Sequence, residues 1–110
     1  MDSNLYLIEV DDPSKTFNEL MEDHDLGLSI AIVERLVYAI ENKLSKVNIA
    51  IIDTGKITIT LHASAPSYVE TLETNIGNLI RYEEYELCAR GKKALEKFKE
   101  SREYIKSLAK

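Results

Sequence analysis

The fold of this chain is decided by residues 47–63, which read VNIAIIDTGKITITLHA. The second half of this stretch alternates strictly between apolar and polar residues, which is typical of a β-strand that buries one face. Asp53 and Gly55 lie between the two apolar runs and supply turn chemistry, because the aspartate accepts local hydrogen bonds and the glycine can take a positive φ. The stretch therefore predicts an antiparallel hairpin with arms at 47–53 and 56–63.

The chain before the hairpin predicts one strand and two helices. Residues 4–10 are rich in strand formers. Asp12 followed by Pro13 is typical of a helix start, with Asp12 as the N-cap and proline at the first helical position. Residues 28–44 carry a broad apolar stripe at helical spacing, which predicts the central core helix. Arg35 falls on the polar side of that helix, so we expect it to face solvent.

The chain after the hairpin, residues 67–110, contains no proline and has a helical pattern throughout. Ser67 and Glu70 have the spacing of a capping box, which predicts that the helix begins at this serine. The aliphatic stripe stops over residues 81–86. At that point we expect the helix to bend or to leave the body of the protein.

The predicted order of elements is β-α-α-β-β-α. It indicates an α+β, two-layer domain with a three-stranded, mainly antiparallel sheet, helices on one face and a long C-terminal helix. We divide the chain into a compact domain, residues 1–86, and a C-terminal helical extension of the same domain, residues 87–110, which offers an interface.

This order of elements is similar to that of type I KH domains, which bind nucleic acid with a Gly-X-X-Gly loop between their two early helices. Here the junction reads HDLGLS, residues 24–29, with one glycine and acidic neighbours. Phosphate would be repelled from such a loop. We therefore expect a likeness in the order of elements only.

Charge is distributed unevenly along the 110 residues, whose formal net charge is −5. Residues 1–55 hold 11 acidic and 4 basic side chains, whereas residues 87–110 hold 8 basic and 3 acidic ones. The overall acidity disfavours general nucleic-acid binding, which depends on neutralising phosphates. Nucleic-acid binding through the basic C-terminal helix stays an alternative.

Composition and chain ends suggest a cytoplasmic protein. The single cysteine, Cys88, excludes a disulfide within one chain. The N-terminus lacks the basic and apolar regions of a signal peptide, and no apolar run approaches the ~18 residues of a membrane span.

Residues that could carry chemistry have simpler interpretations. His24 lies in an acidic turn, and ligands adjacent in sequence do not converge on a metal. His62 lacks an identifiable orienting carboxylate, and Cys88 on a helix is typical of a small packing residue. Asp53-Thr54-Gly55 resembles the triplet of aspartic proteases over three residues, but a turn explains it. We predict no catalytic site, no cofactor and no metal. The alternative is a small enzyme whose site forms across a dimer, with two copies of His62 or Cys88.

The leading hypothesis is a small cytoplasmic protein-interaction or regulatory, inhibitor-like module that acts as a homodimer. Its partner would be another protein or a second copy, not nucleic acid or a membrane. Tyrosine is favoured at interfaces, and two tyrosines lie where the aliphatic stripe lapses. The residues that we predict to make the interaction are Tyr82, Tyr85, Leu87, Phe98, Arg102, Ile105 and Leu108.

Overall fold

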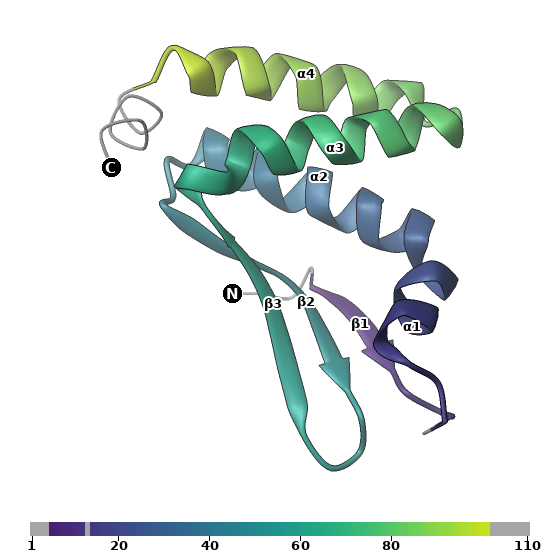
Figure 1. Cartoon of the computed structure of the whole chain (residues 1–110). Coiled ribbons are helices and arrows are strands. Elements are labelled where there is room, and N and C mark those ends of the chain that lie inside the picture. The colour runs from purple at the N-terminus through teal and green to yellow at the C-terminus, as the bar shows by residue number, and fades with distance from the viewer. Residues whose placement is uncertain (1–4, 13, 102–110) are drawn as a thin grey trace.

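The computed structural model describes residues 5–12 and 14–101, and it has an α+β fold (Figure 1). Its elements are β1 (Tyr6–Glu9), α1 (Phe17–Asp23), α2 (Asp25–Glu41), β2 (Lys46–Asp53), β3 (Thr58–Ser64), a 3-10 turn η1 (Ala65–Ser67), α3 (Tyr68–Arg81) and α4 (Tyr85–Lys99). The prediction of an α+β fold is confirmed. The order β-α-α-β-β-α-α has one helix more than predicted.

The three strands form an open, mixed sheet in the order β1-β2-β3. Strands β2 and β3 pair antiparallel, so the predicted hairpin is confirmed. Strand β1 pairs parallel with β2, and the prediction of a mainly antiparallel sheet is wrong. The reason is that α1 and α2 lie between these strands and return the chain to the end of the sheet where β1 started.

The helices form a layer against the sheet, and one core joins them (Figure 1). Helix α2 packs on β2 and β1, while α3 and α4 pack on α2 and on each other. The core contains side chains from every layer, among them Ile8 and Ile52 of the sheet, Leu36 of α2, Leu72 of α3 and Phe98 of α4. Helix α4 therefore shares the core of the rest of the domain.

The predicted long C-terminal helix is broken into α3 and α4, so that prediction is wrong, while the expected bend over residues 81–86 is confirmed. Glu83 has a φ of 61°. The N–H of Glu83 donates to the carbonyl oxygen of Ile80, and the N–H of Glu84 donates to that of Leu79. These two bonds close the helix around a left-handed residue and turn the chain into α4.

The start of α1 differs from the prediction. The capping box is made by Thr16 and Glu19, whose side chains bond each other's backbone N–H groups. Asp12 does not cap a helix, because its carboxylate accepts hydrogen bonds from the N–H and hydroxyl of Ser14. Pro13 lies outside the described residues.

The start of α3 also differs. Ser67 is the N-cap residue, but its side chain makes no capping bond. Its hydroxyl donates instead to the carbonyl oxygen of Ser64, across the 3-10 turn that precedes the helix. The predicted capping box with Glu70 is therefore wrong.

Strand β2 contains a bulge at Ile49, because Asn48 and Ala50 have successive partners on β3. The bulge shifts the alternation of side chains by one residue. Val47 before the bulge, Ile49 within it, and Ala50 and Ile52 after it are consequently all buried. A run that is apolar in sequence thus keeps one buried face.

The side chain of Arg35 on α2 is directed toward this bulge and not toward solvent. It is only 6% exposed, and its Nε donates to the carbonyl oxygen of Asn48 at 2.9 Å. A bulge disrupts the hydrogen-bond ladder locally, so a long donor from the helix can satisfy the carbonyl. The expectation that Arg35 faces solvent is wrong for this reason.

Candidate functional site

The β2–β3 hairpin extends beyond the helical layer (Figure 1). Exposure of the inward residues of β3 rises along it, from 7% at Ala63 to 41% at Ile59 and 61% at Ile57, which precedes the strand. Among the strands, helix α2 packs on β2 and β1. The turn half of β3 therefore has little helical cover, and the predicted burial of its apolar face applies only near the helices.

Ile59 continues a row of core residues toward the surface. Its partner on β2 is Ile52, whose partner on β1 is Ile8. Directly paired residues share a face of the sheet. Ile8 and Ile52 are 0% and 2% exposed, so Ile59 lies on the same face as the core but at its uncovered margin.

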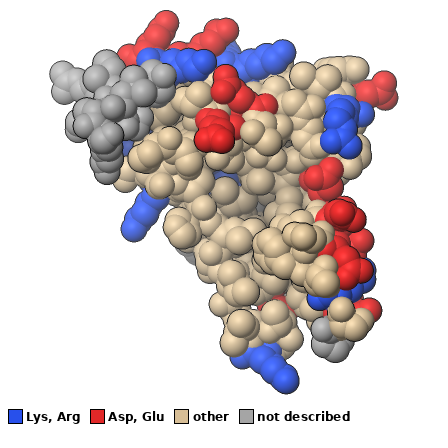
Figure 2. Space-filling model, in the orientation of Figure 1, with Lys and Arg blue, Asp and Glu red and all other residues tan. Residues whose placement is uncertain are grey.

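Strand β3 carries no charged side chain between Thr58 and Ser64. Figure 2 shows the same property at the surface: an uncharged area covers the hairpin, with basic side chains at its tip and acidic ones gathered over α1. In the described part of the chain no strand pairs with the outer edge of β3. We call this edge, together with Ile57 and Ile59, the hairpin surface.

The absence of blocking features on β3 is unusual. Edge strands of natural proteins are commonly protected by lysine, proline or a bulge, because an open edge can pair with another chain. The bulge of this hairpin lies in β2, the inner strand. Lys56 lies in the turn, before the strand begins. The edge of β3 is thus open to strand addition.

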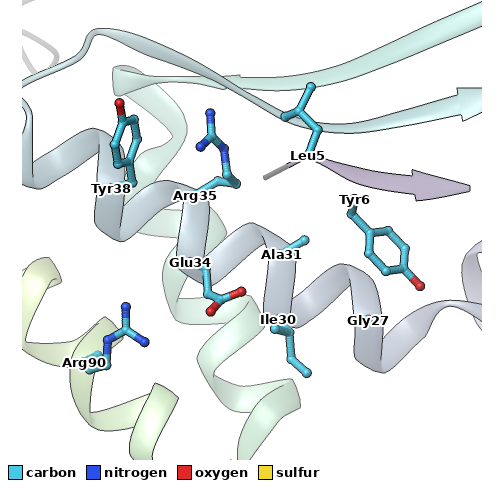
Figure 3. A pocket seen from close by; sticks show the side chains of 9 residues that line it. All are labelled: Leu5, Tyr6, Gly27, Ile30, Ala31, Glu34, Arg35, Tyr38 and Arg90. Atoms are coloured by element: carbon cyan, nitrogen blue, oxygen red, sulfur yellow. The ribbon is translucent and has the colours of Figure 1, made fainter. Parts of the chain in front are cut away.

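A second feature is an open cleft of about 680 Å³ beside α2 (Figure 3). The guanidinium of Arg35 lies 4.9 Å from the ring centroid of Tyr38, its neighbour on α2. Arg90 approaches from α4, as Figure 3 shows. The lining residues offer the cations of Arg35 and Arg90, two phenols and the carboxylate of Glu34. They include no serine, threonine, cysteine or histidine, so the cleft lacks a hydroxyl or thiol paired to a histidine base.

A polar cluster lies where α2 meets α3. The Oγ of Ser29 donates to Asn75, and the amide of Asn78 donates to Ser29 and to Asp25. The hydroxyl of Tyr82 donates to the same carboxylate at 2.9 Å, and this bond raises the pKa of Tyr82. Satisfied polar groups between packed helices specify their register, which is a structural role.

The predicted interaction residues are divided among three environments. Tyr82 and Tyr85 are 40% and 61% exposed. Leu87 and Phe98 are buried in the core, where Phe98 packs on Tyr68 with 5.4 Å between ring centroids. The remaining three predicted residues, Arg102, Ile105 and Leu108, lie outside the described residues. An interaction through the two tyrosines stays a prediction.

The residues considered for chemistry are held in separate places. His24 Nδ1 and the hydroxyl of Tyr6 form a hydrogen bond of 2.8 Å. His62 is exposed on β3, and Cys88 is buried with its Sγ 3.6 Å from the carbonyl oxygen of Ile76. Within residues 5–12 and 14–101, no group of three or more His, Cys, Asp or Glu could hold a metal ion.

The sequence contained a signal for the hairpin surface, namely a Thr/Ile alternation without charges on its polar face. That pattern could not show how far the helices reach, so the exposed residues were expected in the core.

Comparison with protein-family models, with curated proteins and with solved structures finds no match to this chain. No helix among the described residues is long and apolar enough to span a membrane.

Proposed function

We propose that this chain is a protein-interaction module that binds its partner through the hairpin surface. The observation that supports the proposal is the uncharged, unpaired edge of β3 beside the exposed side chains of Ile57 and Ile59. Strand addition to an open edge is a common mode of peptide recognition, in which backbone hydrogen bonds give affinity and side chains give specificity.

The two isoleucines add an apolar contribution to backbone pairing. Complete burial of such a side chain is worth about 1.5 to 3 kcal/mol. Since Ile57 and Ile59 are partly covered already, each would contribute about 1 kcal/mol to an interface. This is enough to favour a partner with apolar residues at alternate positions.

The proposal predicts that Ile59→Lys abolishes partner binding, because a lysine at the interface places a charge against apolar side chains. Ile80→Lys on α3 is a matched control, since Ile80 is 42% exposed and Ile59 is 41% exposed. Each variant and the wild-type chain would be immobilised and incubated with an extract of the native cell, and the retained proteins would be quantified.

We expect a protein that the wild-type chain and Ile80→Lys retain, and that Ile59→Lys does not. If all three chains retain the same proteins in the same amounts, binding does not use the hairpin surface and the proposal is wrong.

A further inference from the structure

We infer that the occupant of the hairpin surface is a second copy of this chain, whose β3 pairs antiparallel with the first about a two-fold axis at Thr60. The inference rests on the proposed function and identifies the partner. It is carried by three properties of β3: the direction of its free backbone groups, the symmetry of its side-chain pattern, and its lack of charge.

The free backbone groups of β3 belong to its even-numbered residues. The N–H of Thr54 donates to the carbonyl oxygen of Ile57, and the N–H of Ala65 donates to that of Ser45. Residues 57 and 65 therefore turn their polar groups toward the neighbouring arm. Along a strand these directions alternate, so Thr58, Thr60 and His62 turn theirs toward the open edge.

An antiparallel pair with a two-fold axis at Thr60 uses all of these groups. Thr60 then lies opposite Thr60 of the partner copy, and Thr58 lies opposite its His62. Each of these is a hydrogen-bonded pair, in which two residues exchange both backbone bonds. In the described part of one chain these residues lack a strand neighbour on this side, and in a pair of chains they become mutual partners.

The side chains of residues 56–64, KITITLHAS, are symmetric in kind about Thr60. Odd positions are apolar and even positions are polar. In the pairing about Thr60, Ile59 lies opposite Leu61 of the partner copy, and Ile57 lies opposite its Ala63. The two most exposed apolar residues of the hairpin therefore gain apolar neighbours on the face that continues the core.

Charge does not oppose this pairing. Residues 58–64 carry no charged side chain, and Lys56 lies opposite Ser64 of the partner copy. An isologous contact places each residue near its own symmetry mate, so a charge near the axis would repel itself. Two copies of β3 in this register therefore set apolar residues opposite apolar ones and polar residues opposite polar ones, with no like charges facing each other near the axis.

The result is one continuous sheet of six strands, in the order β1-β2-β3-β3-β2-β1. Full closure of a sheet is one way to remove an open edge, and pairing with another chain is a second. In this arrangement the helical layers of the two copies lie on the same face of the common sheet, since the two-fold axis at a hydrogen-bonded pair is perpendicular to the sheet and does not exchange its faces.

Solution mass of the full chain tests the inference. Sedimentation equilibrium over a concentration series should show a dimer, and Ile59→Lys should raise its dissociation constant more than about tenfold, because each copy then places a lysine opposite Leu61 of the other. Ile80→Lys is the matched control and should dimerise like wild type. Thr60→Pro is a second variant: it removes an N–H that faces the open edge and should also give a monomer.

Amide exchange and cross-linking test the pairing itself. The amides of Thr58, Thr60 and His62 should become protected from hydrogen exchange as the protein concentration rises. Under mild oxidation Thr60→Cys should form a disulfide-linked dimer rapidly, because the axis brings the two cysteines together. Thr58→Cys should not, since its symmetry mate lies four residues away along the paired strands.

The inference is overturned by a dimer that Ile59→Lys leaves intact, or by equal cross-linking of Thr58→Cys and Thr60→Cys. It is also overturned by a chain that stays monomeric at every concentration. If the chain stays monomeric but retains another protein from the cell extract, and Ile59→Lys abolishes that retention, the proposed function holds with a different partner.

Discussion

Gly27 of α2 lies directly against the ring of Tyr6 on β1. A Cβ added at Gly27 would lie 2.3 Å from the hydroxyl of Tyr6 and 2.7 Å from its Cζ. The ring cannot retreat without losing the hydrogen bond between its hydroxyl and His24. Glycine at this position therefore permits β1 to lie against α2.

We predict that Gly27→Ala lowers the free energy of unfolding by about 1 to 2 kcal/mol, because overpacking outweighs the gain in helix propensity. Gly77→Ala should instead raise it by up to about 1 kcal/mol, since a Cβ there meets nothing within 4 Å. Urea unfolding of the two variants measures both effects. In a Tyr6→Leu background the penalty of Gly27→Ala should disappear, and a penalty that persists there would show that Tyr6 is not its cause.

Tyr68 couples stability to high pH. It is fully buried, its hydroxyl donates to the carbonyl oxygen of Leu44 at 2.9 Å, and burial raises its pKa to about 12. In the unfolded chain the phenol loses its proton near pH 10. Between these values the folded state holds a proton that the unfolded state has released, so the contribution to stability is complete below pH 10 and falls as pH rises.

We predict that wild-type stability falls by about 2 to 3 kcal/mol from this group as pH rises from 10 to 12. Tyr68→Phe removes the titration, although it also leaves the Leu44 carbonyl without this donor. The difference in unfolding free energy between the two proteins should therefore narrow across that interval, as measured by urea unfolding at a series of pH values. Curves that run parallel from pH 9 to 12 would contradict this assignment.

At the scale of elements, the ends of two helices use residues that are poorly suited to their backbone. Glu83 and Lys43 follow α3 and α2 with φ values of 61° and 55°. In both cases the N–H of the left-handed residue and the N–H of the residue after it close the helix. At the end of α2, Lys43 donates to the carbonyl oxygen of Ile40 and Leu44 donates to that of Ala39. Glycine is the usual residue at this position, since it has no Cβ to clash.

We predict that Glu83→Gly raises the free energy of unfolding by about 0.5 to 1 kcal/mol, because relief of the left-handed strain exceeds the added entropy of the unfolded chain. Glu86→Gly, within the first turn of α4, should have the opposite sign, since it only removes helix propensity. Thermal and urea unfolding measure both. A loss of stability in Glu83→Gly would show that its side chain makes a contribution larger than the strain.

The elements also show what a local pattern can and cannot predict. The turn at Asp53 and Gly55 was predicted because its chemistry is local: the N–H of Gly55 donates to Asp53 Oδ1 at 2.9 Å, and Gly55 has a φ of 85°. The bulge at Ile49 was not predicted, because it is set by register against β3 and by the donor that Arg35 brings from α2. Neither β3 nor Arg35 is adjacent to Ile49 in the sequence.

At the scale of the whole molecule, the shape is elongated, with principal extents of 44 × 30 × 25 Å and a radius of gyration of 14.6 Å. A compact domain of this length would have a radius of about 13 Å. Helices α3 and α4 lie at one end and the turn of the hairpin projects at the other, as Figure 1 shows. The projection exposes Ile57 and Ile59, so the proposed interaction and the pairing of two copies both depend on this shape.

The sequence by itself determined the features that neighbouring residues decide: the hairpin, the helical character of residues 28–41, the bend before α4 and the α+β class. Alternation, helical spacing and turn chemistry act over a few residues, and they can be recognised in one chain without its fold. The sequence also pointed to a protein-interaction module, which stays a proposal.

Only the tertiary structure decided the parallel pairing of β1, the burial of Arg35 and the exposure of Ile59. Ile59 and Leu61 belong to one alternating pattern, yet Ile59 is 41% exposed whereas Leu61 packs against the core. Burial depends on what packs above a residue, and that neighbour comes from distant parts of the chain. The helical layer ends partway along β3, and the part of β3 beyond it forms the hairpin surface.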